Sequence, residues 1–225
     1  NRRLPAIEDS KMQIKLNMKL VALLDKAGRY DEKLKLTREL RHRRNLPKEV
    51  WRSVVKQEGR ALHMLARSDD LMNFFDELIE VAEKRGDASE QAWLLGEKLQ
   101  FAIFTPLLKE TIAVGYACRE ANRHGSDDWM TATHLTGVQM RRAGRLAEAL
   151  RLSEELYEVD PQTFASVFAA ESLAKLGRFD EAKIWIKNAE AAAAFAESSR
   201  RGDQSFAGIV RDKIESLRKQ HSKLE

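Results

Sequence analysis

Apolar residues recur along the chain at the three- and four-residue spacing of helices. Leu71, Phe74, Phe75, Leu78, Ile79 and Ala82 form one such stripe, and Met12, Leu16, Leu20, Leu23 and Leu24 form another. This spacing places the apolar side chains on one face of a helix. No segment alternates between apolar and polar residues for long enough to predict a strand. The pattern therefore predicts an all-α protein.

The breaks between the stripes carry residues that are typical of helix ends. Glycine suits the left-handed residue after a helix, and proline suits the first turn of the next one. The breaks divide the chain into eleven predicted helices, at residues 5–27, 30–45, 47–67, 70–85, 88–104, 106–124, 127–143, 146–158, 161–176, 179–198 and 203–222.

The predicted helices group as five antiparallel hairpins and one final helix. The hairpin turns fall near Gly28, Ser68, Thr105, Gly144 and Gly177, which are 40, 37, 39 and 33 residues apart. A recurring helix pair of this length cannot bury its apolar face alone, so stacked pairs are expected. This spacing is typical of an α-solenoid.

One short motif, Gly-Arg-apolar-x-Glu, occurs three times, starting at Gly28, Gly144 and Gly177. In each copy we expect glycine to end a helix, the apolar residue to fill the bend, and glutamate to begin the next helix at its positive end. Ala149 and Ala182 follow the glutamate in the later copies, where a small side chain allows the two helices to cross closely. The motif therefore marks the bend of a helical hairpin.

The later copies resemble tetratricopeptide repeats. That family has a small residue in the first helix, a glycine-bearing turn, an alanine in the second helix and a proline at the end. Gly137, Gly144, Ala149 and Pro161 match all four features; Ala170, Gly177, Ala182 and Ala189 match the next unit, in which Ala194 replaces the proline. The resemblance implies an α-α superhelix of about five antiparallel hairpins with a C-terminal capping helix.

The resemblance differs in strength along the chain. It is clearest in the repeats at residues 127–161 and 162–198, and it identifies the helix at 203–222 as the cap. It is weaker over the first 45 residues, and from Pro47 to Gly125 it rests on helix length and spacing. We expect one tetratricopeptide-like domain over residues 1–225. Because the chain begins at Asn1 without a methionine, we also expect it to be a fragment of a larger protein.

Composition narrows the range of functions. The 225 residues include 33% charged residues, with a net charge of +4, as in a globular protein with a mild basic bias. The single cysteine, Cys118, excludes an internal disulfide and a zinc site built from cysteines. No apolar run is long enough to cross a membrane, so we expect no membrane insertion and a cytoplasmic location.

Candidate catalytic chemistry is lacking in the sequence. The histidines, His42, His63, His124, His134 and His221, are scattered without a metal-binding spacing. The glycines stand singly at helix ends, so no phosphate-binding loop is formed. Carboxylates lie at helix starts and on polar faces. The sequence therefore predicts a protein that is not an enzyme and has no catalytic residues, cofactor or metal.

The resemblance implies a concave groove lined by the first helix of each pair. It places nine late residues in that groove: His134, Val138, Arg141, Arg142, Phe164, Val167, Phe168, Glu171 and Lys175. Aromatic side chains beside two arginines favour an amphipathic helix or an extended peptide with acidic flanks. The predicted function is therefore binding of another protein or peptide. The alternative is that Phe164 and Phe168 only pack against the preceding hairpin.

The densest basic run offers a second hypothesis. Arg38, Arg41, Arg43, Arg44 and Lys48 could contact phosphates, which predicts a helical repeat that binds nucleic acid. No aromatic residue interleaves with them to stack on bases, so a solvated helix end is the alternative. A third hypothesis is a peptide-sensing regulatory domain of a larger signalling protein.

Overall fold

The computed structural model describes residues 3–43, 46–161, 164–198 and 204–224. This part of the chain is all-helical and contains eleven α-helices and no strand. They are α1 (Arg3–Lys26), α2 (Tyr30–Arg41), α3 (Lys48–Met64), α4 (Ser68–Lys84), α5 (Ala88–Ala102), α6 (Leu108–Ala121), α7 (Asp127–Arg142), α8 (Leu146–Val159), α9 (Ala165–Lys175), α10 (Phe179–Ser198) and α11 (Gln204–Gln220), followed by the short 3₁₀ turn Ser222–Leu224.

The prediction of eleven helices is confirmed for the described residues, and the differences lie at helix ends. Helix α3 ends before the predicted residue 67 because Ala66 is left-handed. Helix α6 begins at Leu108 and α9 at Ala165, so the prolines at 106 and 161 precede these helices. The predicted helix end at residue 45, the predicted start of the second repeat at 162 and the predicted helix start at 203 lie outside the described residues.

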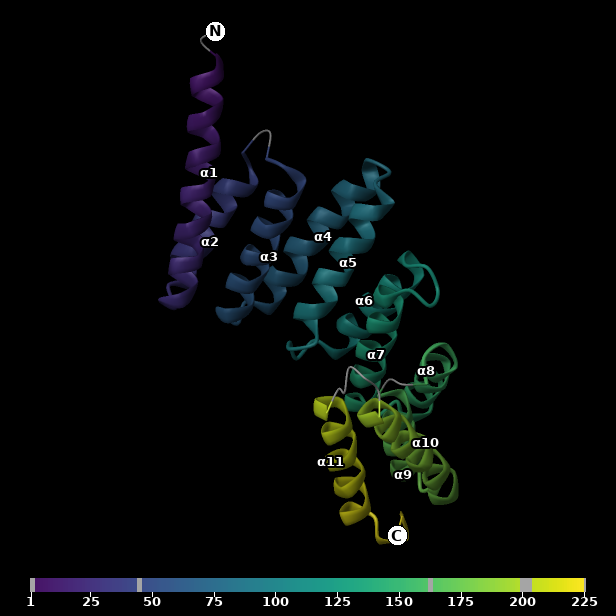
Figure 1. Cartoon of the computed structure of the whole chain (residues 1–225). Coiled ribbons are helices and arrows are strands. Elements are labelled where there is room, and N and C mark those ends of the chain that lie inside the picture. The colour runs from purple at the N-terminus through teal and green to yellow at the C-terminus, as the bar shows by residue number, and fades with distance from the viewer. Residues whose placement is uncertain (1–2, 44–45, 162–163, 199–203, 225) are drawn as a thin grey trace. The chain divides into compact units, whose positions relative to one another are not determined.

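The chain forms two compact units, Asn1–Thr105 and Pro106–Glu225, which we call unit 1 and unit 2. Within each unit, consecutive helices pack side by side (Figure 1). The hairpin turn predicted near Thr105 falls on the boundary between the units. The pairing of α5 with α6, and the single domain over residues 1–225, therefore stay predictions.

Each unit has its own apolar core. The core of unit 1 contains buried residues from α2 to α5, including Leu34, Leu62, Phe75 and Leu94. The largest core cluster of unit 2 joins α8, α9, α10 and α11 through residues such as Leu150, Val167, Leu173, Ile186 and Ile214. Helix α11 thus belongs to the core of unit 2 and covers the apolar face of the preceding pair, as a terminal helix of a repeat array does.

The repeated Gly-Arg motif forms the hairpin bends, as the sequence predicts. Gly28, Gly144 and Gly177 have φ values of 67°, 75° and 75°. The arginine after each glycine donates its backbone N–H to a carbonyl five residues back, at 2.9–3.0 Å. This is the Schellman arrangement that ends a helix at a left-handed residue. In addition, each arginine side chain pairs with the glutamate of its own motif, a contact that the sequence analysis missed.

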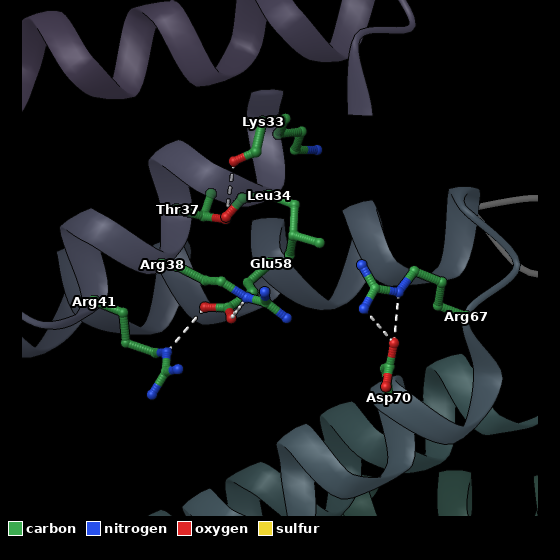
Figure 2. A network of polar contacts seen from close by, with 8 residues as sticks. All are labelled: Lys33, Leu34, Thr37, Arg38, Arg41, Glu58, Arg67 and Asp70. Carbon is green, nitrogen blue, oxygen red and sulfur yellow. Dashed lines mark hydrogen bonds and ion pairs between the residues drawn. The ribbon is translucent and has the colours of Figure 1, made fainter. Parts of the chain in front are cut away.

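A fourth bend of the same kind lacks the glycine. Ala66 joins α3 to α4 with φ 55°, the left-handed region that alanine rarely adopts. Arg67 donates its backbone N–H to the Leu62 carbonyl at 3.0 Å, and its side chain pairs with Asp70 (Figure 2). The turn predicted near Ser68 is therefore a divergent copy of the motif. Alanine replaces the glycine, serine replaces the apolar residue, and aspartate replaces the glutamate.

We expect Ala66→Gly to stabilise the protein. Glycine adopts positive φ without the steric cost that alanine has there, and part of this gain is offset by the greater freedom of glycine in the unfolded chain. The free energy of unfolding in urea should rise by about 0.5–1 kcal/mol. The matched control Ala22→Gly, at an exposed position inside α1, should lower it by about the same amount. A destabilised Ala66→Gly would contradict this account of the bend.

Candidate functional site

The residues predicted to line the groove lie in unit 2, on and beside α7 and α9. Helix α7 begins at Ser126, whose side chain accepts a hydrogen bond from the Trp129 N–H at 3.3 Å. It ends before the bend at Gly144, and α9 ends before the bend at Gly177. Helix α8 packs against both α7 and α9, and α11 packs against α9. Three helices, α7, α9 and α11, therefore supply most of the side chains described below.

A row of stacked side chains connects these three helices. The Arg141 guanidinium lies 3.9 Å from the centre of the Phe168 ring, and the His134 ring centre lies 4.9 Å from it. Phe164 follows Phe168 at 6.1 Å, and Phe206 of α11 follows Phe164 at 4.8 Å. These distances are those of favourable cation–π and tilted aromatic pairs.

An open pocket of about 450 Å³ lies beside this row. Its lining is Asp127, Met130, Thr131, His134, Leu156, Phe164 and Phe206. The apolar members come from four segments of unit 2, and the polar members all lie on α7. The volume falls within the range of about 300–1,000 Å³ that is typical of ligand pockets.

Arg141 is a buried cation behind the row. Its side chain is 9% exposed, and Glu171 lies 3.6 Å away. Glu171 also faces Lys213 of α11 at 3.6 Å, so one carboxylate lies between two cations. Burial lowers the pKa of Arg141, and Glu171 partly opposes this effect. The Nη1 atom of Arg141 has no hydrogen-bond partner among the described residues. Arg141 therefore supports the Phe168 ring from inside the unit.

His134 is neutral at physiological pH. Burial, together with the positive charge of Arg141, lowers its pKa to about 4. The imidazole thus presents a neutral ring to Phe168 and to the pocket.

The predicted groove residues therefore have different environments. His134 and Phe164 line the pocket, and Phe168, Arg141 and Glu171 lie in the contacts next to it. Val167 is fully buried in the core, so its assignment to a groove surface was wrong. The other three, Val138, Arg142 and Lys175, do not line the pocket, and Arg142 donates to the Gln139 side chain at 2.9 Å.

The sequence analysis missed the contribution of α11. Phe206 lines the pocket and Lys213 faces Glu171, whereas the sequence assigned α11 only the role of a cap. The signal was present, because Phe206 and Lys213 lie seven residues apart and so share one helical face. Met130 and Leu156 were also missed, since their spacing is equally consistent with core packing.

The basic run of unit 1 is largely paired within the chain. Arg41 and Arg38 both point to Glu58 of α3, at 2.9 and 3.4 Å (Figure 2). The Glu58 side chain is 1% exposed, so the two arginines neutralise a buried carboxylate. The Arg41 guanidinium also lies 5.3 Å from the Phe74 ring centre. These two arginines hold α2 against α3.

The remaining members of the run differ. Lys48 pairs with Glu90 at 2.8 Å and lies 3.8 Å from Asp87. Arg43 is exposed, and Arg44 lies outside the described residues. Three of the four described cations of the run thus face carboxylates of their own chain, which reduces the charge available to phosphates. Nucleic-acid binding by the run stays a prediction.

Other candidate chemistry gives no site in the described part of the chain. No group of three or more His, Cys, Asp or Glu side chains there could hold a metal ion. Cys118 is buried, and burial raises the pKa of its thiol to about 11, so it is protonated at neutral pH. None of the described helices is long and apolar enough to span a bilayer.

The chain is similar in fold to solved tetratricopeptide-like proteins. A singly substituted form of a putative kinesin light chain from Podosopora anserina, with TPR-like repeats, is 13% identical with a TM-score of 0.61, over 83% of this chain and 97% of that one. BtubC (BKLC) from P. vanneervenii is 13% identical with a TM-score of 0.58, over 97% of this chain and 85% of that one. No protein-family model and no curated protein matches the sequence.

These comparisons and the helix pairs define the class of protein. The chain has the all-α, tetratricopeptide-like fold of consecutive helical hairpins, as the sequence predicts.

We expect Glu58→Gln to destabilise unit 1. The change removes the partner of Arg41, which is 16% exposed, and of Arg38, which is half exposed. Breaking a buried pair costs about 3–5 kcal/mol, and because both arginines can reach solvent we expect a loss of about 1–3 kcal/mol in urea unfolding. Glu80→Gln, which removes an exposed pair with Lys84, is the control and should leave the free energy of unfolding essentially unchanged. Equal effects would contradict the structural role of Glu58.

His134 gives a pH-dependent prediction. Its pKa is lowered to about 4 in the folded protein, so between about pH 6.5 and about pH 4 the unfolded chain takes up a proton that the folded chain does not. The wild-type protein should therefore lose about 2–3 kcal/mol more than His134→Gln as the pH falls through this range, as measured by urea unfolding. Parallel pH profiles of the two proteins would show that His134 is not buried as described.

Proposed function

We propose that unit 2 binds a peptide segment of another protein by taking a large apolar side chain into the pocket beside α7, α9 and α11. The observation that carries this proposal is the open pocket lined by Met130, Leu156, Phe164 and Phe206. Pockets of this size with mostly apolar walls and a few polar groups are the usual sites for such ligands.

The pocket also indicates the charge of the partner. Arg141 is buried and faces Glu171, so its charge is directed into the unit rather than at a ligand. Among the described residues, neither arginine nor lysine lines the pocket, whereas Asp127 does and is exposed. The sequence favoured a partner peptide with acidic flanks; the lining of the pocket instead favours a partner with a basic flank. The partner segment has an apolar anchor with a basic residue beside it.

The sequence left two roles open for the aromatic residues, binding anchor or internal packing, and we assign each role to different rings. Phe168 is held between Arg141 and His134, so it acts as internal packing that supports the wall of the pocket. Phe164 and Phe206 lie in the wall itself and remain partly exposed. Aromatic side chains placed in this way are typical binding anchors, because they bury a large area at little entropic cost.

The test uses a phage-displayed library of random peptides selected on the whole chain. Selected peptides should share a large apolar residue next to a lysine or arginine. Thr131→Arg places a long cation at the exposed edge of the pocket, and it should weaken the binding of these peptides by about tenfold or more in fluorescence anisotropy.

The matched control is Ala147→Arg, which adds the same side chain at an exposed position of α8 outside the pocket lining. Peptides that bind both variants as well as the wild type would show that the pocket is not the binding site. Selection of acidic peptides that are lost with Thr131→Arg would keep the pocket and overturn the assigned charge.

A further inference from the structure

Helix α1 exposes an apolar stripe that no part of the described structure covers. Met12, Leu16, Leu20 and Leu23 are 59%, 51%, 45% and 61% exposed. At about 100° per residue, the four side chains fall within an arc of about 80° and extend over about three helical turns. The apolar pattern correctly predicted a helix here. However, the face of α1 that packs on the core is not this stripe but the face formed by Met18, Val21 and Leu24.

A row of lysines borders this stripe. Lys11, Lys15, Lys19 and Lys26 are exposed and lie along one edge of the same helical face. The described side chains contain no ion-pair partner for any of them. The only carboxylate between residues 11 and 26 is Asp25, which pairs instead with Lys33 and Arg60. Other exposed helical lysines, such as Lys84 and Lys219, pair with a glutamate four residues away.

The outer face of α11 differs from that of α1. On its described side chains, α11 exposes one large apolar residue, Ile209, and Arg211 and Arg218 pair with glutamates of α10. The outer face of α11 is therefore largely polar, as suits a face in contact with solvent. Helix α1 instead exposes an apolar stripe beside lysines that have no partner among the described side chains, so its outer face is suited to contact rather than to solvent.

We infer that the outer face of α1 docks an acidic amphipathic helix of a partner protein. Leucine and methionine at spacings of four, four and three residues fit the ridges of another helix. The lysine edge then selects a partner with glutamates or aspartates beside its own apolar stripe. This site is separate from the pocket proposed in unit 2 and does not depend on it.

Two other occupants fit less well. A second copy of the chain that docked α1 antiparallel on α1 would bring two lysine edges together, where like charges repel. A parallel copy would separate the two edges but would offer neither of them a free carboxylate between residues 11 and 26. A membrane surface would match the lysines, but the stripe has no tryptophan, tyrosine or phenylalanine, which interfacial helices commonly place on the apolar face.

The test uses the whole chain and a phage-displayed library of helical peptides. Each peptide has leucines fixed at helical spacing, and its flanking positions are randomised among Glu, Lys and Gln. We expect the wild-type chain to enrich glutamate at the flanking positions. The selected peptides should bind about tenfold or more weakly to the variant Leu16→Gln/Leu20→Gln. The variant Lys15→Glu/Lys19→Glu should enrich lysine instead.

The control variant Ile184→Gln/Ile209→Gln removes two other exposed apolar side chains and should bind like the wild type. Thr131→Arg should also leave this binding unchanged, which separates the result from the pocket of unit 2. All substituted side chains of α1 are exposed, so the urea unfolding of the variants should match that of the wild type.

Three outcomes would overturn the inference. The first is enrichment of neutral or basic peptides on the wild-type chain, or equal binding to the leucine variant. The second is binding to phosphatidylserine vesicles that the leucine variant loses, with no acidic peptide selected. The third is self-association in sedimentation equilibrium that disappears with the leucine variant.

Discussion

The hairpin bend is the constraint on which the rest of the structure depends. At five bends of the described chain, one residue has positive φ and the next donates its backbone N–H five residues back. Besides the four bends already described, at Gly28, Ala66, Gly144 and Gly177, the fifth is at Gly86, between α4 and α5. This arrangement satisfies a carbonyl at the end of one helix and directs the chain into the next within a few residues. Where the bend carries an arginine, its ion pair with the first turn of the following helix is exposed and contributes little energy. The geometry of that pair nevertheless restricts how the second helix starts.

The bends at Gly144 and Gly177 account for the site in unit 2. They reverse the chain between α7 and α8 and again between α9 and α10, so α8 packs on α7 and α10 packs on α9. Helix α8 also packs on α9, which brings the two helix pairs together. Arg141 and Glu171, from α7 and α9, then meet behind the Phe168 ring. Helix α11 completes the site, because Phe206 extends the aromatic row and Lys213 provides the second cation for Glu171. Repeat packing thus brings together side chains that are far apart in sequence.

The local sequence pattern was sufficient to predict the helices and most of the bends between them. Helical spacing and glycine positions predict the eleven helices. The resemblance to tetratricopeptide repeats grouped five residues that contact one another in the structure, namely His134, Arg141, Phe164, Phe168 and Glu171. That they line a binding groove stays a prediction. The contacts that change the chemistry are long-range. Glu58 neutralises Arg38 and Arg41 from a separate helix, and Phe206 reaches the pocket from α11. The Ala66 bend was not recognised as a copy of the motif because alanine there gives no local signal for positive φ.

Periodicity also cannot tell a core face from a docking face, and α1 shows why. This helix has two apolar faces, one formed by Met18, Val21 and Leu24 and one by the stripe from Met12 to Leu23. A helix that is apolar on both sides is expected between two layers of protein. In unit 1 only the first face is covered by the other described helices. The exposure of the second face shows that no described residue covers it. The lysines beside it, which have no partner among the described side chains, determine the charge of the surface that fits there. One helix thus has two apolar faces with different roles, a core face and a docking face, and the lysines along the edge of the docking face distinguish it from the core face.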